Sequence, residues 1–257
     1  MHHHVSPAPG LVTVSPRHFR AQMAWLAKEN YVSLTADRYA DYLQGEAMPR
    51  KSVLITFDDG WLDNWLYAHP VLAEFGLHAV MFLVTARVGD GPARNEATAL
   101  DHRAAKAAIA AGQADEAMLR WSEIEAVGQA GTFEFHSHTH THTRWDRQLP
   151  PGRGRDEALA QDLAASRAVL FHRLGAATAH LCWPQGYYDE DYLKVAAASG
   201  FSHLYTIEDR VTVPGEDSRR IGRQVVKDKG AFWFASRMAV WRRPGLARIY
   251  AAARGKS

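Results

Sequence analysis

The sequence has little cysteine and no long hydrophobic run. Cys182 is the only cysteine in 257 residues, so no disulfide can form within the chain. No apolar stretch approaches the roughly 18 residues that a membrane-spanning helix needs, and the first residues do not have the pattern of a signal peptide. As it stands, the sequence predicts a cytoplasmic protein with no integral membrane segment. A periplasmic or membrane-peripheral location is expected instead if an export segment has been trimmed away.

The sequence also has no excess of one charge. The chain has 30 basic and 28 acidic residues, for a formal net charge of +2. A nucleic acid or another polyanion is therefore not indicated as a partner. Nearly half of the residues are hydrophobic, which allows a sizeable core and excludes global disorder. The length suits one large domain spanning residues 1–257. No feature of the sequence indicates an oligomeric state.

Short apolar runs alternate with segments of helical periodicity along most of the chain. Residues 78–85 are nearly all apolar, as in a strand buried on both faces, whereas residues 16–30 and 61–75 show the spacing of helices. This alternation predicts an α/β fold with a parallel sheet, either closed as a barrel or doubly wound. We further expect a helical insertion over 89–118, a strand over 221–226 and a C-terminal helix over 231–252.

Two adjacent carboxylates follow the apolar run at residues 52–55. Asp58 and Asp59 stand at the end of this expected strand, before Gly60. Burying one ionised carboxylate costs several kcal/mol unless a cation or hydrogen-bond donors compensate it, so the pair indicates a bound cation. A histidine-rich run, 136–142, follows another expected strand. One aspartate with two histidines is a ligand set for a catalytic zinc-like ion.

The histidine run offers more than one ligand pair. His136 with His140 and His138 with His142 are both four residues apart, a spacing at which one turn of helix-like backbone aims two imidazoles the same way. Spacing alone does not choose between these registers.

Three segments resemble the motifs of a known family, the carbohydrate esterase family 4 polysaccharide deacetylases, which share the NodB-homology domain. They occur in the family's order over about residues 50–190, and they read Thr56-Phe57-Asp58-Asp59-Gly60, Ser137-His138-Thr139-His140-Thr141-His142 and Trp183-Pro184-Gln185-Gly186-Tyr187-Tyr188-Asp189. The resemblance implies a single distorted (β/α) barrel of about seven strands. It also implies that His2 to His4 are native residues of a first strand rather than remnants of a purification tag.

The resemblance implies a role for each motif. The first motif makes Asp58 the catalytic base and Asp59 a metal ligand. The second selects His138 and His142 as the other ligands, with His136 and His140 as neighbours of the site or as the alternative pair. In the third, the backbone N–H of Gln185 helps to hold the oxyanion. The implied cofactor is a divalent metal, Zn²⁺ first, with Co²⁺, Ni²⁺ or Mn²⁺ as alternatives.

The chain departs from the family pattern in two places. Many members take their general acid from a late Leu-x-His motif, but no histidine follows His203; His3, His69, His203 or Asp58 itself would have to substitute. The arginine that often opens the third motif, and that steadies the catalytic base, is replaced by Cys182 or Leu181. Arg223 is a candidate replacement from another strand.

The resemblance implies a carbohydrate substrate. Trp61, Trp145, Pro184 and Tyr187 are expected to line the groove, whereas Trp65 and Trp183 are expected in the core. The predicted activity is removal of N-acetyl groups from an N-acetylhexosamine-containing glycan or glycolipid. Two alternatives are a metal amidase acting on a small non-sugar amide and a non-catalytic carbohydrate-binding relic that retains the metal site.

Overall fold

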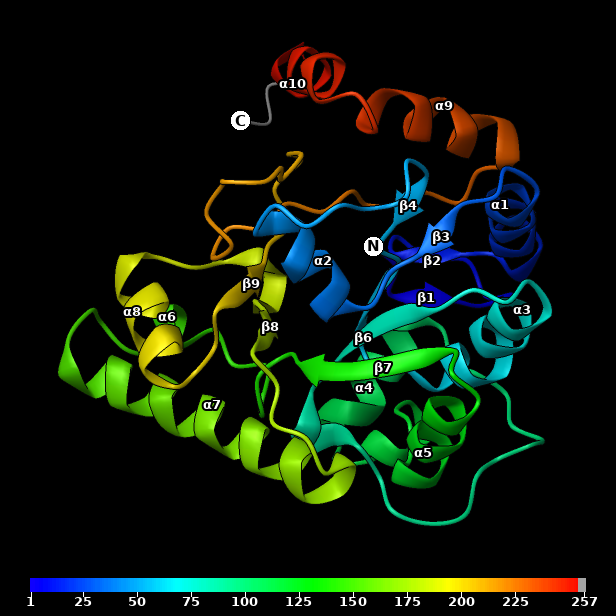
Figure 1. Cartoon of the computed structure of the whole chain (residues 1–257). Coiled ribbons are helices and arrows are strands. Elements are labelled where there is room, and N and C mark those ends of the chain that lie inside the picture. Colours follow the sequence, from blue (N-terminus) through cyan, green and yellow to red (C-terminus); the bar gives the residue numbers. More distant parts are fainter. Residues whose placement is uncertain (254–257) are drawn as a thin grey trace.

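The computed structural model describes residues 1–253 and is built around one curved parallel sheet (Figure 1). Its five strands lie side by side in the order of the sequence. They are β5 (Thr56–Asp59), β6 (Ala79–Leu83), β7 (Phe133–Ser137), β8 (His180–Cys182) and β9 (His203–Tyr205). Because every neighbouring pair is parallel, the carboxyl ends of all five strands meet at one edge of the sheet.

Single-residue bridges extend this sheet at both edges, and two short strand pairs form separate two-stranded sheets. His2 bridges to Phe57 at one edge, and Ile221 bridges to Tyr205 at the other. Two further parallel pairs are formed by β1 (His4–Val5) with β2 (Thr13–Val14) and by β3 (Val32–Ser33) with β4 (Ser52–Val53). The curved sheet agrees with the predicted distorted barrel. His2, bridged to this sheet, and His4, in β1, are both parts of the fold.

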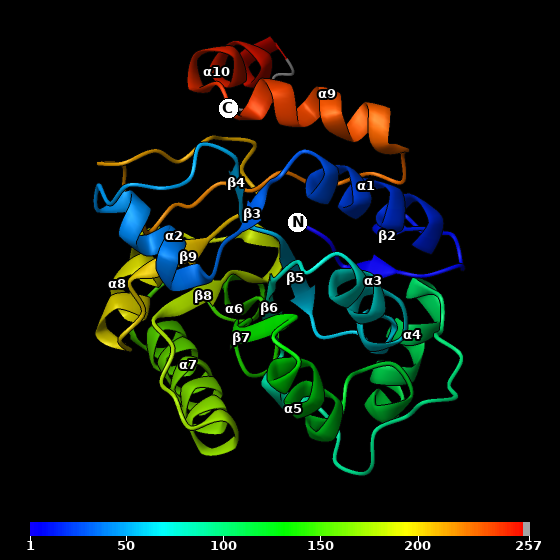
Figure 2. The same cartoon turned by 45° about the vertical axis from the view of Figure 1, so that its right-hand side comes forward.

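Helices follow most strands and cover the outer face of the sheet, as Figure 2 shows for α3, α5 and α7. The helices are α1 (Pro16–Lys28), α2 (Ala36–Leu43), α3 (His69–Glu74), α4 (His102–Ala110), α5 (Trp121–Gln129), α6 (Trp145–Gln148), α7 (Arg153–Leu174), α8 (Glu190–Ala198), α9 (Ala231–Trp241) and α10 (Pro244–Ala253). A π-helical turn spans Asn64–Ala68, and 3₁₀ turns span Thr85–Arg87, Ala114–Glu116 and Pro184–Gly186.

Strand β6 lies at the centre of the core. All five of its residues are fully buried, as expected of a parallel strand that is covered on both faces. Phe57 and Phe133 on the flanking strands pack edge to face, with ring centroids 5.2 Å apart. This rigid centre fixes the ends of β5 and β7, where the acidic pair and the histidine run begin.

Four predicted elements differ from the structure. The helix expected over 61–75 does not include Trp61, which bridges to Met118, and it contains a π-helical turn over Asn64–Ala68 before α3. The strand expected over 221–226 is wrong beyond Ile221, since the chain leaves the sheet there. The helix expected over 231–252 is broken after Trp241, because Pro244 has no N–H to continue it and instead opens α10. The insertion over 89–118 is helical only in α4 and one 3₁₀ turn.

Candidate active site

The acidic pair ends strand β5 in a conformation that turns the chain sharply. Asp59 has a φ of 75° and Gly60 a φ of 88°. A left-handed conformation at a non-glycine residue stores strain and is common at functional sites. Added Cβ atoms at Gly60 would lie 2.7 Å from Leu83, so glycine is required for the turn. The turn holds two buried carboxylates next to each other at the edge of the sheet.

Asp59, His138 and His142 come together as a candidate metal centre. The Nε2 atoms of His138 and His142 each lie 3.5 Å from Oδ1 of Asp59. That oxygen is buried and has no hydrogen-bond partner within the described residues. An unpartnered buried carboxylate oxygen is costly, and a cation shared by these three atoms would remove the cost. The donor set therefore fits a divalent metal.

His138 is oriented by its other ring nitrogen. Its Nδ1 lies 2.8 Å from the backbone carbonyl oxygen of Cys182, so Nδ1 carries the proton and the lone pair of Nε2 is free to bind a metal beside Asp59. This arrangement is common for metal-binding histidines. Burial and the neighbouring His138 lower the pKa of His142 to about 4, which keeps the imidazole neutral and able to bind a metal.

The alternative histidine register faces away from Asp59. Nδ1 of His140 pairs with the hydroxyl of Thr85, and Nδ1 of His136 pairs with that of Thr178. The structure thus brings together the pair 138/142, which the family resemblance selects, and leaves the pair 136/140 in structural contacts.

Asp162 on α7 holds the histidine loop in place. Its carboxylate accepts hydrogen bonds from the backbone N–H groups of His140 and Thr141 and from the indole of Trp145. Sequence reasoning missed this residue. A signal was present, because Asp162 falls among the regularly spaced apolar residues on the buried face of the helix, where an unpaired acid is not expected.

Trp61 does not line the groove as predicted. Only 3% of its surface is exposed, and its indole N–H donates to Oδ2 of Asp59 at 3.0 Å. His4 packs on the ring with centroids 4.3 Å apart, and its Nδ1 is 2.5 Å from a carboxylate oxygen of Asp63. Trp61 therefore orients the candidate metal ligand, and the groove prediction for it is wrong.

Asp58 is paired with Arg223, which reaches it from the loop after β9. The guanidinium nitrogens lie 2.6 and 2.8 Å from the two carboxylate oxygens. Burial alone would raise the pKa of Asp58, but this bidentate pair holds it well below its usual range. Arg223 thus occupies the place expected for the missing arginine, although it comes from a loop and not from a strand.

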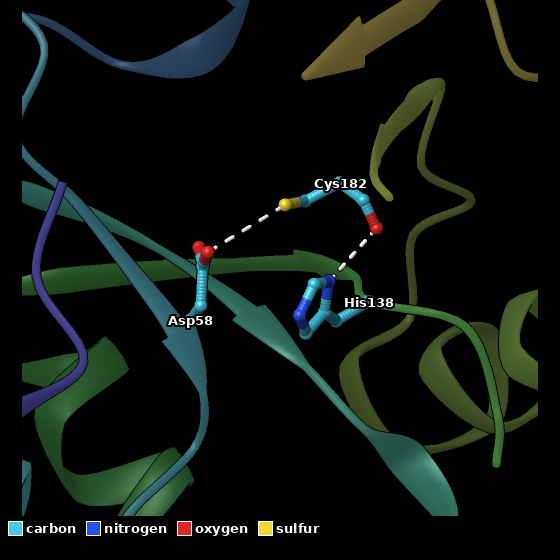
Figure 3. A group of neighbouring side chains, drawn as sticks. All are labelled: Asp58, His138 and Cys182. Carbon is cyan, nitrogen blue, oxygen red and sulfur yellow. Dashed lines mark hydrogen bonds between the residues drawn. The ribbon is translucent and has the colours of Figure 1, made fainter. Parts of the chain in front are cut away.

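Cys182 completes the surroundings of Asp58, and Figure 3 shows both residues beside His138. The thiol sulfur lies 3.7 Å from Asp58 and 2.9 Å from Arg223. Asp58, His138 and Cys182 are close enough to form a second ligand set. However, burial raises the pKa of the Cys182 thiol, and Arg223 already supplies the positive charge. The set containing Asp59 fits a metal better.

The candidate general acids lie in different places. Nε2 of His3 is 3.9 Å from Oδ2 of Asp58, and about a quarter of its side chain is exposed. His69 stacks on Trp65 and pairs with Thr132. His203 stacks on His180. Of the three histidines, His3 is the one beside the acidic pair.

The third motif forms a tight turn beside the site. Gln185 has a φ of 56°, and its side chain accepts a hydrogen bond from Arg144. Pro184 and Trp183 are buried, so the prediction that Pro184 lines the groove is wrong. Tyr187 is half-buried under the Arg144 guanidinium, 4.1 Å from its ring centroid. Trp145 is also half-buried. Trp183 thus packs in the core as expected, and the side chains of Tyr187 and Trp145 remain partly accessible.

A curved parallel sheet with a buried carboxylate pair and an Asp-His-His set at its carboxyl edge has the donor groups of a metal-dependent hydrolase. The family model for polysaccharide deacetylase matches residues 45–204, more than half of the chain. The chain belongs to this family. It is therefore a hydrolase that removes N-acetyl groups from a polysaccharide.

Individual relatives agree with this assignment. The chain is 24% identical to poly-beta-1,6-N-acetyl-D-glucosamine N-deacetylase of Staphylococcus aureus strain MSSA476, over 84% of the chain and 68% of the relative. It is 27% identical to a putative polysaccharide deacetylase of Bacillus subtilis, over 86% and 66% respectively. Among solved structures, IcaB from Ammonifex degensii has a TM-score of 0.74 at 26% identity, covering 94% of both chains.

The fold is also similar to that of the deacetylase PplD from Streptococcus pyogenes, solved with acetate. The TM-score is 0.75 at 20% identity, covering 93% of this chain and 96% of the other. The predicted distorted barrel is thereby confirmed. No helix among residues 1–253 is both long and apolar enough to span a bilayer.

Proposed function

We propose that the chain removes N-acetyl groups from a β-1,6-linked N-acetylglucosamine polymer, with Asp58 as base and a zinc ion held by Asp59, His138 and His142. The observation that carries the site assignment is the buried Oδ1 of Asp59, which has no partner and lies 3.5 Å from both imidazole Nε2 atoms. The linkage is inferred from the Staphylococcus aureus relative, which matches 84% of the chain.

When bound, a divalent cation at this site supplies Lewis-acid chemistry, because it polarises the acetamide carbonyl and acidifies a nearby water. Asp59, His138 and His142 would hold the ion, and a catalytic zinc with three protein ligands would keep a position open for water or substrate. One carboxylate with two imidazoles suits zinc better than magnesium or calcium, which prefer oxygen ligands.

Asp58 accepts the proton of the attacking water. Arg223 and the Cys182 thiol fix its carboxylate in one orientation, so that the proton passes to a positioned oxygen. The turn at Gln185 offers a backbone N–H as a donor to the developing oxyanion. His3, beside Asp58 and partly exposed, is placed to give a proton to the departing amine.

Acetate release tests this proposal. Purified protein is incubated with β-1,6-linked and β-1,4-linked N-acetylglucosamine oligomers, first without metal and then with Zn²⁺, Co²⁺, Ni²⁺ or Mn²⁺. We expect metal-dependent release, fastest from the β-1,6 linkage. Asp58→Asn should abolish release while the bound metal content stays unchanged. Faster release from β-1,4 oligomers would overturn the linkage, and activity in Asp58→Asn would overturn the role of the base.

A further inference from the structure

The two C-terminal helices form a hairpin on the outside of the molecule. In Figures 1 and 2, α9 lies over α1, and α10 lies beside α9 at the periphery, away from the sheet. Phe234 holds α9 against α1, because its ring packs against Trp25 with centroids 5.8 Å apart, and Trp241 joins α9 to α10 by packing on Tyr250, also at 5.8 Å. The hairpin is thus a packed part of the fold with one face left outward.

The hairpin carries three large apolar side chains in contact with solvent. Phe232 is 91% exposed, Ile249 is 69% exposed and Leu246 is 46% exposed. Leu246 and Ile249 are three residues apart on α10, so they share one face of that helix. Exposing such side chains is unfavourable, and clustered exposed apolar residues indicate an interaction surface.

The same segment has only one sign of charge. From Lys229 to Ala253 there are five basic residues and no aspartate or glutamate, although the whole chain is nearly neutral. Arg248 pairs with Glu216, and Arg237 pairs with the Tyr250 hydroxyl. Arg242 and Arg243 are exposed at the turn between the helices, and neither has a carboxylate hydrogen-bond partner among residues 1–253.

We propose that this hairpin docks on the surface of a membrane that contains anionic lipids. Exposed aromatic and aliphatic tips flanked by arginines are the pattern of helices that lie in the interfacial layer of a bilayer. The arginines pair with lipid phosphates, while Phe232, Leu246 and Ile249 enter the boundary of the acyl chains. A soluble polyanion would pair with the arginines but would leave the apolar side chains in water. A protein partner would not require that the segment lack acidic residues.

Vesicle sedimentation tests the proposal with the full chain. Wild-type protein is mixed with vesicles of phosphatidylcholine alone or of equal parts phosphatidylcholine and phosphatidylglycerol. We expect binding to the anionic vesicles only, weakening with added salt. Removing both charges in Arg242→Gln with Arg243→Gln should weaken partition about 30-fold. Replacing the tips in Phe232→Ser with Ile249→Ser should weaken it roughly tenfold or more.

Matched changes elsewhere serve as controls. Phe171→Ser removes an aromatic side chain that is 59% exposed on α7, and Arg50→Gln with Arg103→Gln removes two exposed charges; both should bind as the wild type. Because a variant can fail to fold, bilayer-embedded bromolipids provide a second measurement on the wild type, where they should quench Trp233 and Trp241. The proposal would be overturned if the protein bound neutral vesicles equally well or bound no vesicles. It would also be overturned if the hairpin variants bound like the wild type, or if the protein captured dextran sulfate but not vesicles.

Discussion

The candidate metal centre can be compared with a second cluster deeper in the same sheet, formed by His136, His180 and His203 with Glu134 and Asp37. Both regions contain imidazoles and carboxylates. His136 lies on β7 and His138 directly follows that strand, two residues later, while His180 precedes Cys182 by two residues on β8. Because side chains alternate along a strand, each residue of these pairs projects from the same face. Both regions therefore place imidazoles and carboxylates on one surface, about one step apart along the strands.

The two regions differ in how their carboxylates are satisfied. In the deeper cluster, Glu134 accepts a hydrogen bond from the backbone N–H of Ala36, and His180 lies 2.9 Å from Asp37 and 3.2 Å from the hydroxyl of Tyr205. In the candidate metal centre, Oδ1 of Asp59 has no such partner. Nε2 of His136 also has no hydrogen-bond partner among the described residues, so the difference lies in the carboxylates. A buried carboxylate oxygen left unpaired beside two imidazoles, rather than the residue types, marks the place for a metal.

The first prediction breaks this comparison with one matched pair of substitutions. His138→Gln should lose stoichiometric metal and all measurable acetate release, because one of three ligands is removed. His136→Gln, two residues earlier, should retain both. Metal content after dialysis and acetate release are measured on the same preparations. Loss of metal in His136→Gln with retention in His138→Gln would reverse the assignment of the two regions.

The second prediction concerns the buried pair of Arg223 and Asp58. Arg223→Gln leaves the Asp58 carboxylate buried without its cation, so the free energy of unfolding should fall by about 3–5 kcal/mol. Urea denaturation of metal-free protein measures this change. A double-mutant cycle with Asp58→Asn is the control, since Arg223→Gln should cost less when Asp58 carries no charge. Equal costs in both backgrounds would mean that the pair contributes nothing.

The third prediction isolates the hydrogen bond from Trp61 to Asp59. Trp61→Phe keeps an aromatic ring in the core but removes the indole N–H, so the metal affinity should fall about 10–100-fold. Titration with Zn²⁺ in a competing chelator measures the affinity. Trp145→Phe, which removes a different indole N–H from Asp162, is the comparison. An unchanged affinity in Trp61→Phe would limit Trp61 to a packing role.

The sequence predicts the placement of the acidic pair and the histidines because the relevant physics is local. Parallel strands bring their carboxyl ends to one edge, and Asp58 and His138 both follow apolar strands. The sequence offers Arg223 as a candidate partner of Asp58, but it does not predict that Arg223 lies in a loop. The path of the backbone beyond Ile221 depends on contacts distant in sequence. The burial of Trp61 depends likewise on the insertion, where Ala117 accepts the N–H of Leu62. Such long-range contacts produce no periodic pattern in the sequence from which they could be predicted.

The last and smallest predicted effect is the pH dependence of stability that His180 of the deeper cluster contributes. Burial, assisted by His136 and opposed by Asp37, lowers the pKa of His180 to about 4, compared with about 6.5 in an unfolded chain. Between these values the unfolded state binds a proton that the folded state does not, so stability should fall as the pH drops from 6.5 toward 4. His180→Gln should lose less stability over this range. Urea denaturation at several pH values checks the difference. Metal-free protein is used because protons then do not compete with a bound metal. If the free energy of unfolding changed equally with pH in the two proteins, His180 would not be linked to unfolding.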